Sequence, residues 1–305
     1  MKGKRKEKAV VIGGAGFIGS HLADRLIQSG FDVHVIDNLS GGKRENVNRK
    51  AKLHIADICD IKSIKSIIKG AKYVFHLAAL PRVQFSIEHP IETHEANVNG
   101  TLNVLVASVE GKVGRVIYSA SSSAYGDQKI FPLKEDMRAN PKSPYGVQKY
   151  IGELLCRVWS EVYGLETVSL RYFNVYGPRL NPDGAYALVI GKFLKQWKEG
   201  LPQTITGDGK QTRDFTHVED VVRANILAAL SKKAGKGEVL NIGAGRNISI
   251  NRVAKLIGGP VKFIAPRLEP HDTLADNSLA KKLLGWKPKI KFEYGIARLK
   301  KLWQV

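Results

Sequence analysis

The sequence predicts an α/β fold, with a doubly wound parallel sheet and a smaller mixed α+β lobe. In the first half of the chain, short runs rich in Val and Ile alternate with amphipathic helical patterns. These apolar runs are continuous, which is typical of parallel strands that are buried on both faces. Strand–helix alternation of this kind builds a sheet with helices on both sides and right-handed connections.

The individual elements follow from these patterns in chain order. Strands are predicted at 8–14, 31–38, 52–58, 72–79 and 113–122. Helices are predicted at 17–30, 63–71, 96–112 and 143–159, the first closed by a glycine at its end.

After Gly164 the pattern becomes less regular. Residues 166–178 read as one more strand that runs into a loop, and from there short elements are mixed with Pro and Gly. We therefore expect two lobes, 1–176 and 177–305, with a cleft between them. Part of 214–245 is expected to return to the first lobe.

Composition limits the class of protein. Apolar residues at 43% and charged residues at 25% are ordinary values for a globular chain. No apolar run is long enough to span a membrane, and the basic start lacks the apolar core of a secretory signal. Two cysteines cannot form a disulfide framework or a four-cysteine zinc site, so we expect a cytoplasmic protein without a metal.

The formal net charge of +20 suggests anionic partners. Lys and Arg are nevertheless spread along the whole chain, and no zinc-finger or RNA-recognition motif accompanies them. We therefore expect neither nucleic acid nor a membrane as a partner.

A glycine-rich turn follows the first predicted strand. Gly14, Gly16 and Gly19 form a G-x-G-x-x-G pattern, and Gly13 begins a second one in an earlier register. Such glycines let backbone N–H groups approach a pyrophosphate at a helix N-terminus. Asp37 ends the next strand, where a carboxylate accepts the ribose hydroxyls of NAD and repels the 2′-phosphate of NADP. The turn predicts a Rossmann-type NAD site; the alternative is a plain strand–turn–helix with a solvated Asp37.

Asp57 ends the third predicted strand. It is a candidate to bond the adenine amine of a dinucleotide. The alternative is a helix N-cap just before 61–63.

Tyr145 and Lys149 share one face of a predicted helix, since they are four residues apart. A neighbouring ammonium favours the phenolate, so we expect the pKa of Tyr145 to be lowered towards neutrality, as a general acid/base requires. Tyr125 and Lys129 have the same spacing, but they follow a strand as a loop. Tyr125 is therefore interpreted as a structural aromatic residue.

A serine-rich turn, 119–123, ends the strand at 113–122. Ligands of open parallel sheets bind at the carboxyl ends of strands, where a hydroxyl can bond a substrate oxygen. The alternative is an ordinary turn. No G-x-S-x-G motif supports a serine hydrolase.

Together these motifs resemble the extended short-chain dehydrogenase/reductase family, and within it the NAD-dependent epimerases and dehydratases of nucleotide sugars. The resemblance is closest to UDP-glucose or UDP-N-acetylglucosamine 4-epimerases. It covers almost the whole chain through VIGGAGFIGSHL (11–22), VIDNLSGG (35–42), HLAA (76–79), ANVNGT (96–101), SASSSAYG (119–126), SPYGVQK (143–149), LRYFNVYGP (170–178), TRDFTHVEDV (212–221) and LNIG (240–243).

The resemblance implies a role for each matching residue. Tyr145 would be the catalytic base, Lys149 its partner and a ligand of the nicotinamide ribose, and Ser121 the residue that bonds the sugar 4-hydroxyl. The cofactor contacts it implies, besides Tyr145 and Lys149, are Gly13, Gly16, Phe17, Ile18, Asp37, Asn38, Asp57, Ile58, Leu77, Ala78, Ala79 and Phe173. The substrate contacts it implies are Ser122, Ser123, Asn174, Leu188, Val189, Thr204, Ile205, Arg213, Glu269 and Thr273, with Asn174 and Arg213 at the phosphates.

The serine turn also separates reactions within the family. The resembling 4,6-dehydratases have Asp-Glu at this strand end, and the decarboxylases have a Glu, whereas this chain has Ser122 and Ser123. Epimerisation is therefore favoured. Its implied course is hydride transfer from C4 to NAD, a 4-keto sugar that turns over in the pocket, and hydride return to the other face.

The segment 265–272 departs from the family pattern. Glu269 aligns with an acid, but Arg267 falls one position late and Leu268 replaces a Gly, which puts Arg267 in doubt as a diphosphate ligand. Thr273 aligns with a residue that screens bulk at sugar C2. Because Thr is small, an N-acetylated UDP-sugar is expected to fit beside UDP-glucose and UDP-galactose.

Two alternatives to this epimerase stay open. One is another enzyme on the same scaffold, a UDP-glucuronate 4-epimerase or a keto-sugar reductase. The other is a non-catalytic nucleotide- or RNA-binding protein with a retained Rossmann lobe, which the Tyr145, Lys149 and Ser121 set disfavours.

The predicted helices at 96–109 and 150–163 carry more apolar residues than one core face requires. They predict a homodimer formed through a helix pair, the alternative being packing within the monomer. His76 and Cys156 are interpreted as core residues.

Overall fold

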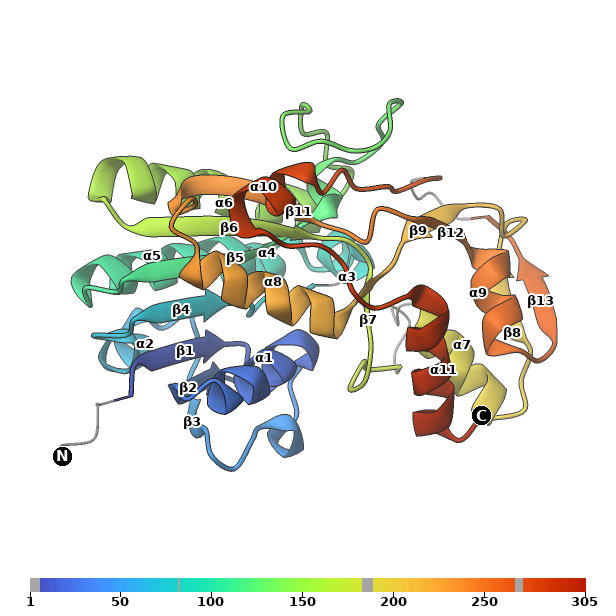
Figure 1. The fold of residues 1–305 in the computed structure, drawn as a ribbon, viewed down its shortest axis with the longest axis horizontal. Helices are drawn as coiled ribbons and strands as arrows, with labels where there is room; N and C mark the ends of the chain where they lie inside the picture. Colours follow the sequence, from blue (N-terminus) through green and yellow to red (C-terminus); the bar gives the residue numbers. More distant parts are fainter. Residues whose placement is uncertain (1–5, 82, 183–188, 267–270) are drawn as a thin grey trace.

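A seven-stranded parallel sheet forms the larger lobe (Figure 1). In this computed structural model, residues 6–81, 83–182, 189–266 and 271–305 are described. The sheet order is β11-β6-β5-β4-β1-β2-β3, and each pair of neighbours is parallel. The strands are β1 (Lys8–Ile12), β2 (Asp32–Asp37), β3 (Lys52–Ile55), β4 (Tyr73–His76), β5 (Arg115–Ser121), β6 (Glu166–Tyr172) and β11 (Lys236–Ile242).

The register brings the carboxyl ends of the central strands to one edge of the sheet. Ile12 of β1 lies opposite both Ile36 of β2 and His76 of β4, and His76 lies opposite Tyr118 of β5. The loops that follow these strands therefore start side by side. They face the smaller lobe, on the right in Figure 1.

Helices cover both faces of the sheet, as the continuous apolar strands predict. One face packs on α1 (Phe17–Gln28), α8 (Val218–Leu230) and α10 (Ser278–Leu284). The other face packs on α2 (Ile61–Ile68), α5 (Gly100–Glu110) and α6 (Pro144–Tyr163). Short helical segments complete this lobe: η1 (Arg44–Asn46), α3 (Val83–Glu88), α4 (Pro90–His94), η2 (Glu95–Asn99) and η3 (Ser122–Ala124).

The smaller lobe has its own apolar core between three helices and short strand pairs. The helices are α7 (Val189–Lys198), α9 (Ile250–Ile257) and α11 (Phe292–Trp303). The strand pairs are β7 (Val175–Tyr176) with β10 (Thr216–His217), β8 (Gln203–Thr206) with β13 (Val261–Ile264), and β9 (Thr212–Asp214) with β12 (Asn247–Ser249).

The chain crosses between the lobes more than once. After β6 it enters the smaller lobe, and it returns through α8 to add β11 at the edge of the large sheet. Within the described ranges, no helix is both long and apolar enough to cross a membrane.

The predicted α/β architecture with a parallel sheet is confirmed. One predicted helix differs in detail. The expected helix at 96–112 begins as a π-helical turn, η2, and continues as α5. Such a turn re-aims the side chains on it, and π-turns are frequent at functional sites.

Candidate active site

The glycine turn joins β1 to α1. Gly13 has a positive φ of +82°, and a Cβ there would lie 2.6 Å from the backbone nitrogen of Ala78. A Cβ at Gly19 would collide with the carbonyl oxygen of Gly13. Both glycines are therefore required for the close packing of the turn on α1 and on the loop after β4.

The first turn of α1 suits an anion. Its N-cap residue is Gly16, which has no side chain to bond the first N–H groups. Phe17 and Ile18 are the first two helical residues. The free N–H groups and the helix dipole together favour a phosphate at this end. The residues present thus fit the pyrophosphate of a dinucleotide.

Asp37 lies at the end of β2, beside this turn. One carboxylate oxygen accepts the backbone N–H of Ala15 at 2.9 Å, and the other accepts that of Leu39 at 2.8 Å. The side chain is 8% exposed, and each oxygen keeps lone pairs for a ribose hydroxyl.

Asp57 follows β3 in the same region. It accepts hydrogen bonds from Asn38 Nδ2 at 2.9 Å and from the backbone N–H of Cys59 at 2.8 Å. The helix α2 is capped by Asp60, which accepts from the N–H of Lys62. The N-cap interpretation of Asp57 is therefore wrong, because the helix begins beyond its reach.

The loop after β4, which holds Leu77, Ala78 and Ala79, is fixed by a network that sequence reasoning missed. Asn97 bonds both backbone groups of Leu80, with N–O distances of 2.8 Å to the N–H and 3.2 Å to the carbonyl. It also donates to Gln148 at 2.8 Å, and Gln148 donates to Thr93 at 3.0 Å. Asn97 and Gln148 are only 1% and 2% exposed, but their helices carry other polar residues, so nothing in the sequence singled these two amides out.

His76, at the end of β4, is a core residue as predicted, and it is 1% exposed. Its Nε2 donates to Thr101 Oγ1 at 2.9 Å, since that hydroxyl itself donates to the Asn97 carbonyl. Its Nδ1 has no partner among the described residues. Burial, together with the charge of Lys149, lowers the pKa of His76 to about 3, so the ring is neutral.

Helix α6 positions Tyr145 and Lys149. Ser143 caps the helix by accepting the N–H of Gly146 at 3.1 Å, and Pro144 stands at the first helical position. The N–H of Tyr145 donates to Ser86 Oγ at 3.0 Å, which joins the start of α6 to α3. Lys149 Nζ donates to the carbonyl oxygen of Ser119 in β5 at 2.8 Å.

The pKa of Tyr145 differs from the expectation. Burial raises it to about 12, although a hydrogen bond with Ser121 lowers it in part. Burial also lowers the pKa of Lys149 to about 8. Because the ammonium is directed to Ser119, it does not offset the burial of the phenol.

The serine turn lies against Tyr145. Ser121 ends β5, accepts the N–H of Ser123 at 3.1 Å, and donates to its hydroxyl at 3.0 Å. Ser122 and Ser123 form η3. The phenol, the ammonium and the Ser121 hydroxyl thus meet at the carboxyl end of β5. Tyr125, in contrast, is 1% exposed and donates to Asn241 at 2.7 Å, as a structural residue does.

A second group of predicted residues lies where the lobes meet. Asn174 has a positive φ of +28°, and its amide donates to the Asp214 carbonyl at 3.2 Å and to Thr273 Oγ1 at 3.3 Å. Thr273 also accepts the N–H of Asp214 at 3.1 Å. Arg213 Nη1 donates to the carbonyls of Thr212 at 2.9 Å and His271 at 3.0 Å. The structure therefore brings Asn174, Arg213 and Thr273 together.

Other predicted contact residues point inwards. Phe173 is fully buried and packs in one cluster with Tyr125, Leu133 and Ala275. Ile205 is 1% exposed and belongs to the core of the smaller lobe. Ile58 is 7% exposed, and a Cβ on Gly100 would lie 2.6 Å from its Cδ1. The side chains of Phe173 and Ile205 therefore pack in the interior and hold the neighbouring backbone in place.

The remaining predicted residues are only partly placed. Thr204 lies on β8, where its hydroxyl accepts from Gln196 Nε2 at 3.0 Å, and Val189 starts α7. Leu188, Arg267 and Glu269 lie outside the described residues.

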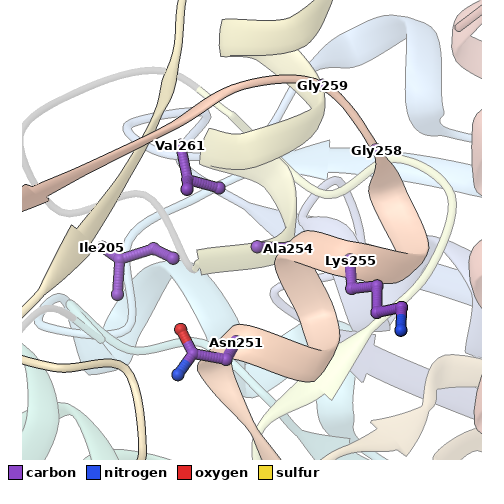
Figure 2. A pocket seen from close by; sticks show the side chains of 7 residues that line it. All are labelled: Ile205, Asn251, Ala254, Lys255, Gly258, Gly259 and Val261. Atoms are coloured by element: carbon purple, nitrogen blue, oxygen red, sulfur yellow. The ribbon is translucent and has the colours of Figure 1, made fainter.

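A pocket of about 360 Å³ lies in the smaller lobe, between α9 and the β8–β13 pair (Figure 2). Its lining is Ile205, Asn251, Ala254, Lys255, Gly258, Gly259 and Val261. All seven belong to the smaller lobe, so this pocket is separate from the end of β5. Across the described ranges, no group of three or more His, Cys, Asp or Glu side chains could hold a metal ion.

A glycine turn for a dinucleotide, next to a buried Tyr–Lys pair and a serine turn, defines a nucleotide-dependent enzyme of the short-chain dehydrogenase/reductase class. The family model "NAD dependent epimerase/dehydratase family" matches residues 9–243. The chain belongs to this family; it is an isomerase whose cofactor is NAD.

Named relatives agree with this assignment. A putative UDP-glucose 4-epimerase from Methanocaldococcus jannaschii is 38% identical over 299 residues, which are 95% of this chain and 96% of that protein. The crystal structure of UDP-glucose 4-epimerase from Thermotoga maritima with UDP-glucose is 40% identical, with a TM-score of 0.91 over 97% of this chain and 99% of that one. UDP-N-acetylglucosamine 4-epimerase from Methanobrevibacter ruminantium, in complex with UDP-N-acetylmuramic acid, is 37% identical, with a TM-score of 0.92 over 98% and 100%.

Proposed function

We propose that the chain interconverts UDP-glucose and UDP-galactose by inverting C4, and that it also accepts the N-acetylated pair. In this proposal the residues of 1–176, with the returning strand β11, hold NAD, and the smaller lobe holds the UDP-sugar. The observation that carries the proposal is the meeting of Tyr145, Ser121 and Lys149 at the end of β5.

The proposed roles follow from the chemistry of these groups. NAD, when bound, accepts and returns the hydrogen of sugar C4 as a hydride. Tyr145, as the phenolate, removes the proton of the 4-hydroxyl and later returns it, while Ser121 bonds the same oxygen. Forming the phenolate means overcoming the burial that raises the pKa of Tyr145 to about 12, and Lys149, whose ammonium donates to Ser119, is the positive charge at this end of the site. The phenol is buried, so water competes poorly for the proton.

The absence of an acid beside Ser121 supports epimerisation over elimination. Elimination of water needs a proton donor and a base at the neighbouring carbons. Ser122 and Ser123 occupy the two positions after Ser121, and their hydroxyls are poor acids. A 4-keto sugar formed here would therefore return to an alcohol.

The small side chain of Thr273 supports acceptance of an N-acetyl group. Its hydroxyl is held by Asp214 and Asn174, and a larger residue at this place would occupy more of the space between the lobes. This part of the proposal rests on the resemblance of Thr273 to a residue that screens sugar C2.

The test is direct. Purified protein is incubated separately with UDP-glucose, UDP-N-acetylglucosamine and UDP-glucuronate, and the C4 epimers are resolved by chromatography. Formation of UDP-galactose and of UDP-N-acetylgalactosamine is the expected result. Conversion of UDP-glucuronate alone would contradict the proposed substrates. Conversion of none of the three would contradict the proposed epimerase activity.

We also propose a homodimer formed through α5 and α6. Outward apolar residues remain half-buried on α5, among them Leu102 and Val106, and Val158 and Val162 of α6 are 40% and 67% exposed. Sedimentation of the wild-type chain is expected to give a dimer, and Val106→Glu a monomer. Leu302→Glu, on the exposed face of α11, is the matched control and should leave the dimer intact. A cytoplasmic location stays a prediction from the cysteine content.

A further inference from the structure

A buried ion pair lies one helical turn behind Lys149. Glu153 follows Lys149 by four residues on α6 and is 2% exposed, and Arg171 of β6 is 3% exposed. Arg171 holds both carboxylate oxygens, with distances of 2.9 Å from Nε to Oε1 and 2.7 Å from Nη2 to Oε2. The guanidinium lies 4.5 Å from the centre of the Tyr125 ring, which fixes its plane. This is a rigid, bidentate pair in the interior.

The groups around Lys149 leave Glu153 as its source of negative charge. Burial lowers the pKa of Lys149 to about 8, while Cys156 and Glu153 raise it. Burial raises the pKa of the Cys156 thiol to about 12, so this group is neutral at working pH. The phenols of Tyr145 and Tyr118 also have raised pKa values because they are buried, so they too are neutral. His76, on β4, is a neutral ring.

Arg171 prevents a direct contact between the lysine and its counter-charge. A free carboxylate at this spacing on a helix would bond the ammonium and draw it along α6. Both oxygens of Glu153 are instead engaged by Arg171, and the Lys149 ammonium donates to Ser119 at the strand end. The charge of Glu153 therefore acts on Lys149 through space. Glu135, which also interacts with Arg171, accepts the N–H of Asn241 at 2.7 Å.

We propose that Glu153 and Arg171 are positioning residues, in which Arg171 clamps the carboxylate so that Glu153 keeps the Lys149 ammonium charged without capturing it. The pair needs no contact with substrate or cofactor. This inference rests on the proposed role of Lys149, but the charge state of that lysine can be measured without any sugar.

The first test measures the titration of Lys149 in Glu153→Gln. Protein labelled at lysine Nζ is titrated by NMR, with and without NAD, and the Lys149 signal is assigned from its loss in Lys149→Met. The isosteric change removes only the charge, so Lys149 is expected to titrate about one pH unit lower. The high-pH limb of epimerase activity should move by the same amount. A folded Glu153→Gln protein with an unmoved Lys149 titration would overturn the proposal.

A control comes from the same strand as Arg171, β6. Arg115 of β5 pairs with Glu166 of β6 at the opposite end, with an Nη2–Oε2 distance of 2.6 Å. Glu166→Gln breaks an ion pair far from Lys149. It should leave both the Lys149 titration and the pH profile unchanged. An equal shift in Glu166→Gln would mean that the loss of any ion pair made by β6 has this effect.

The second test separates charge from packing. In Arg171→Met the carboxylate is released, and we expect it to bond Lys149, which raises the pH at which the lysine titrates and lowers kcat. In Glu153→Met/Arg171→Met the pair is replaced by apolar side chains, a change that buried pairs often tolerate. In this double variant Lys149 should titrate at a lower pH than in the wild type, as it does in Glu153→Gln. An unchanged Lys149 titration would contradict the role of Glu153. If the titration of Lys149 shifts as expected but no UDP-sugar is converted, the proposed function is wrong, while the proposed role of Glu153 and Arg171 stands.

Discussion

The Lys149 ammonium donates a hydrogen bond to the carbonyl oxygen of Ser119, with an Nζ–O distance of 2.8 Å. Ser119 and Ser121 lie on the same strand. The end of β5 therefore positions both Lys149 and Ser121. This bond holds a charged group in a place where it is 3% exposed. It brings charge close to the site at a cost to the stability of the protein.

Lys149→Met should therefore stabilise the protein while it abolishes activity. The pKa of Lys149 is lowered from 10.5 to about 8 in the folded state, so the folded protein disfavours the proton that the unfolded chain keeps. Below pH 8 the ammonium costs about 3 kcal/mol, and this cost disappears as the pH rises from 8 to 10.5. Denaturant unfolding at a series of pH values should show the variant more stable at pH 7, with a difference that shrinks above pH 8. An equal or smaller stability at pH 7 would contradict this account.

Tyr145→Phe should lower kcat by about 10³-fold, because it removes the proton acceptor and keeps the ring. NAD content after purification shows whether the lost hydroxyl also weakens cofactor binding. Tyr125→Phe is the matched control, since it removes a buried hydroxyl that bonds Asn241 and Arg171 rather than the site, and it should retain turnover. Steady-state kinetics and absorbance of released NAD measure both effects. Normal turnover in Tyr145→Phe would rule out the proposed mechanism.

Asp37→Asn should change the preference between the two nicotinamide cofactors. The neutral amide keeps one acceptor oxygen but loses the charge that repels a 2′-phosphate. NAD affinity should fall about tenfold and NADP affinity should rise, as titration calorimetry of the cofactor-free protein can measure. Asp32→Asn, at the other end of β2, should change neither affinity. Continued exclusion of NADP by Asp37→Asn would show that other groups select the cofactor.

Gly19→Ala should destabilise the cofactor turn. The added methyl group would meet the backbone of Gly13 and Gly14, which cannot move aside, and the loss should be about 2 kcal/mol. Gly16→Ala is the comparison, because its Cβ would lie 3.3 Å from the nearest backbone oxygen and its φ is negative. Denaturant unfolding of the cofactor-free proteins should give a clearly higher free energy of unfolding for Gly16→Ala than for Gly19→Ala. The reverse order would mean that the turn packs differently.

Local sequence patterns were enough to predict much of this architecture. Continuous Val and Ile runs predicted the parallel strands, and the glycines with Asp37 predicted the turn at β1, because each signal depends on residues close together in the chain. Tyr145 and Lys149 were recognisable for the same reason, since one helix sets their spacing.

Contacts between distant segments were not predictable in this way. Arg171 meets Glu153 from another strand, and Asn97 meets Leu80 only because a π-turn aims its amide at the loop. The raised pKa of Tyr145 also escaped prediction, because helical spacing does not tell how deeply a phenol is buried or where the lysine points. Ile205 turns inwards because side chains alternate along β8, and Phe173, just after β6, is buried in the cluster with Tyr125, Leu133 and Ala275.

The strand β11 joins the large sheet after the chain has passed through the first part of the smaller lobe, from β7 to β10. On the ribosome, β6 is therefore synthesised long before its neighbour, and its outer edge stays open while some sixty further residues emerge. An open edge of this kind pairs readily with other chains. The nascent protein thus has a vulnerable interval that ends only when Ile242 has left the exit tunnel. A truncated chain that stops at Tyr176 would remain in that state.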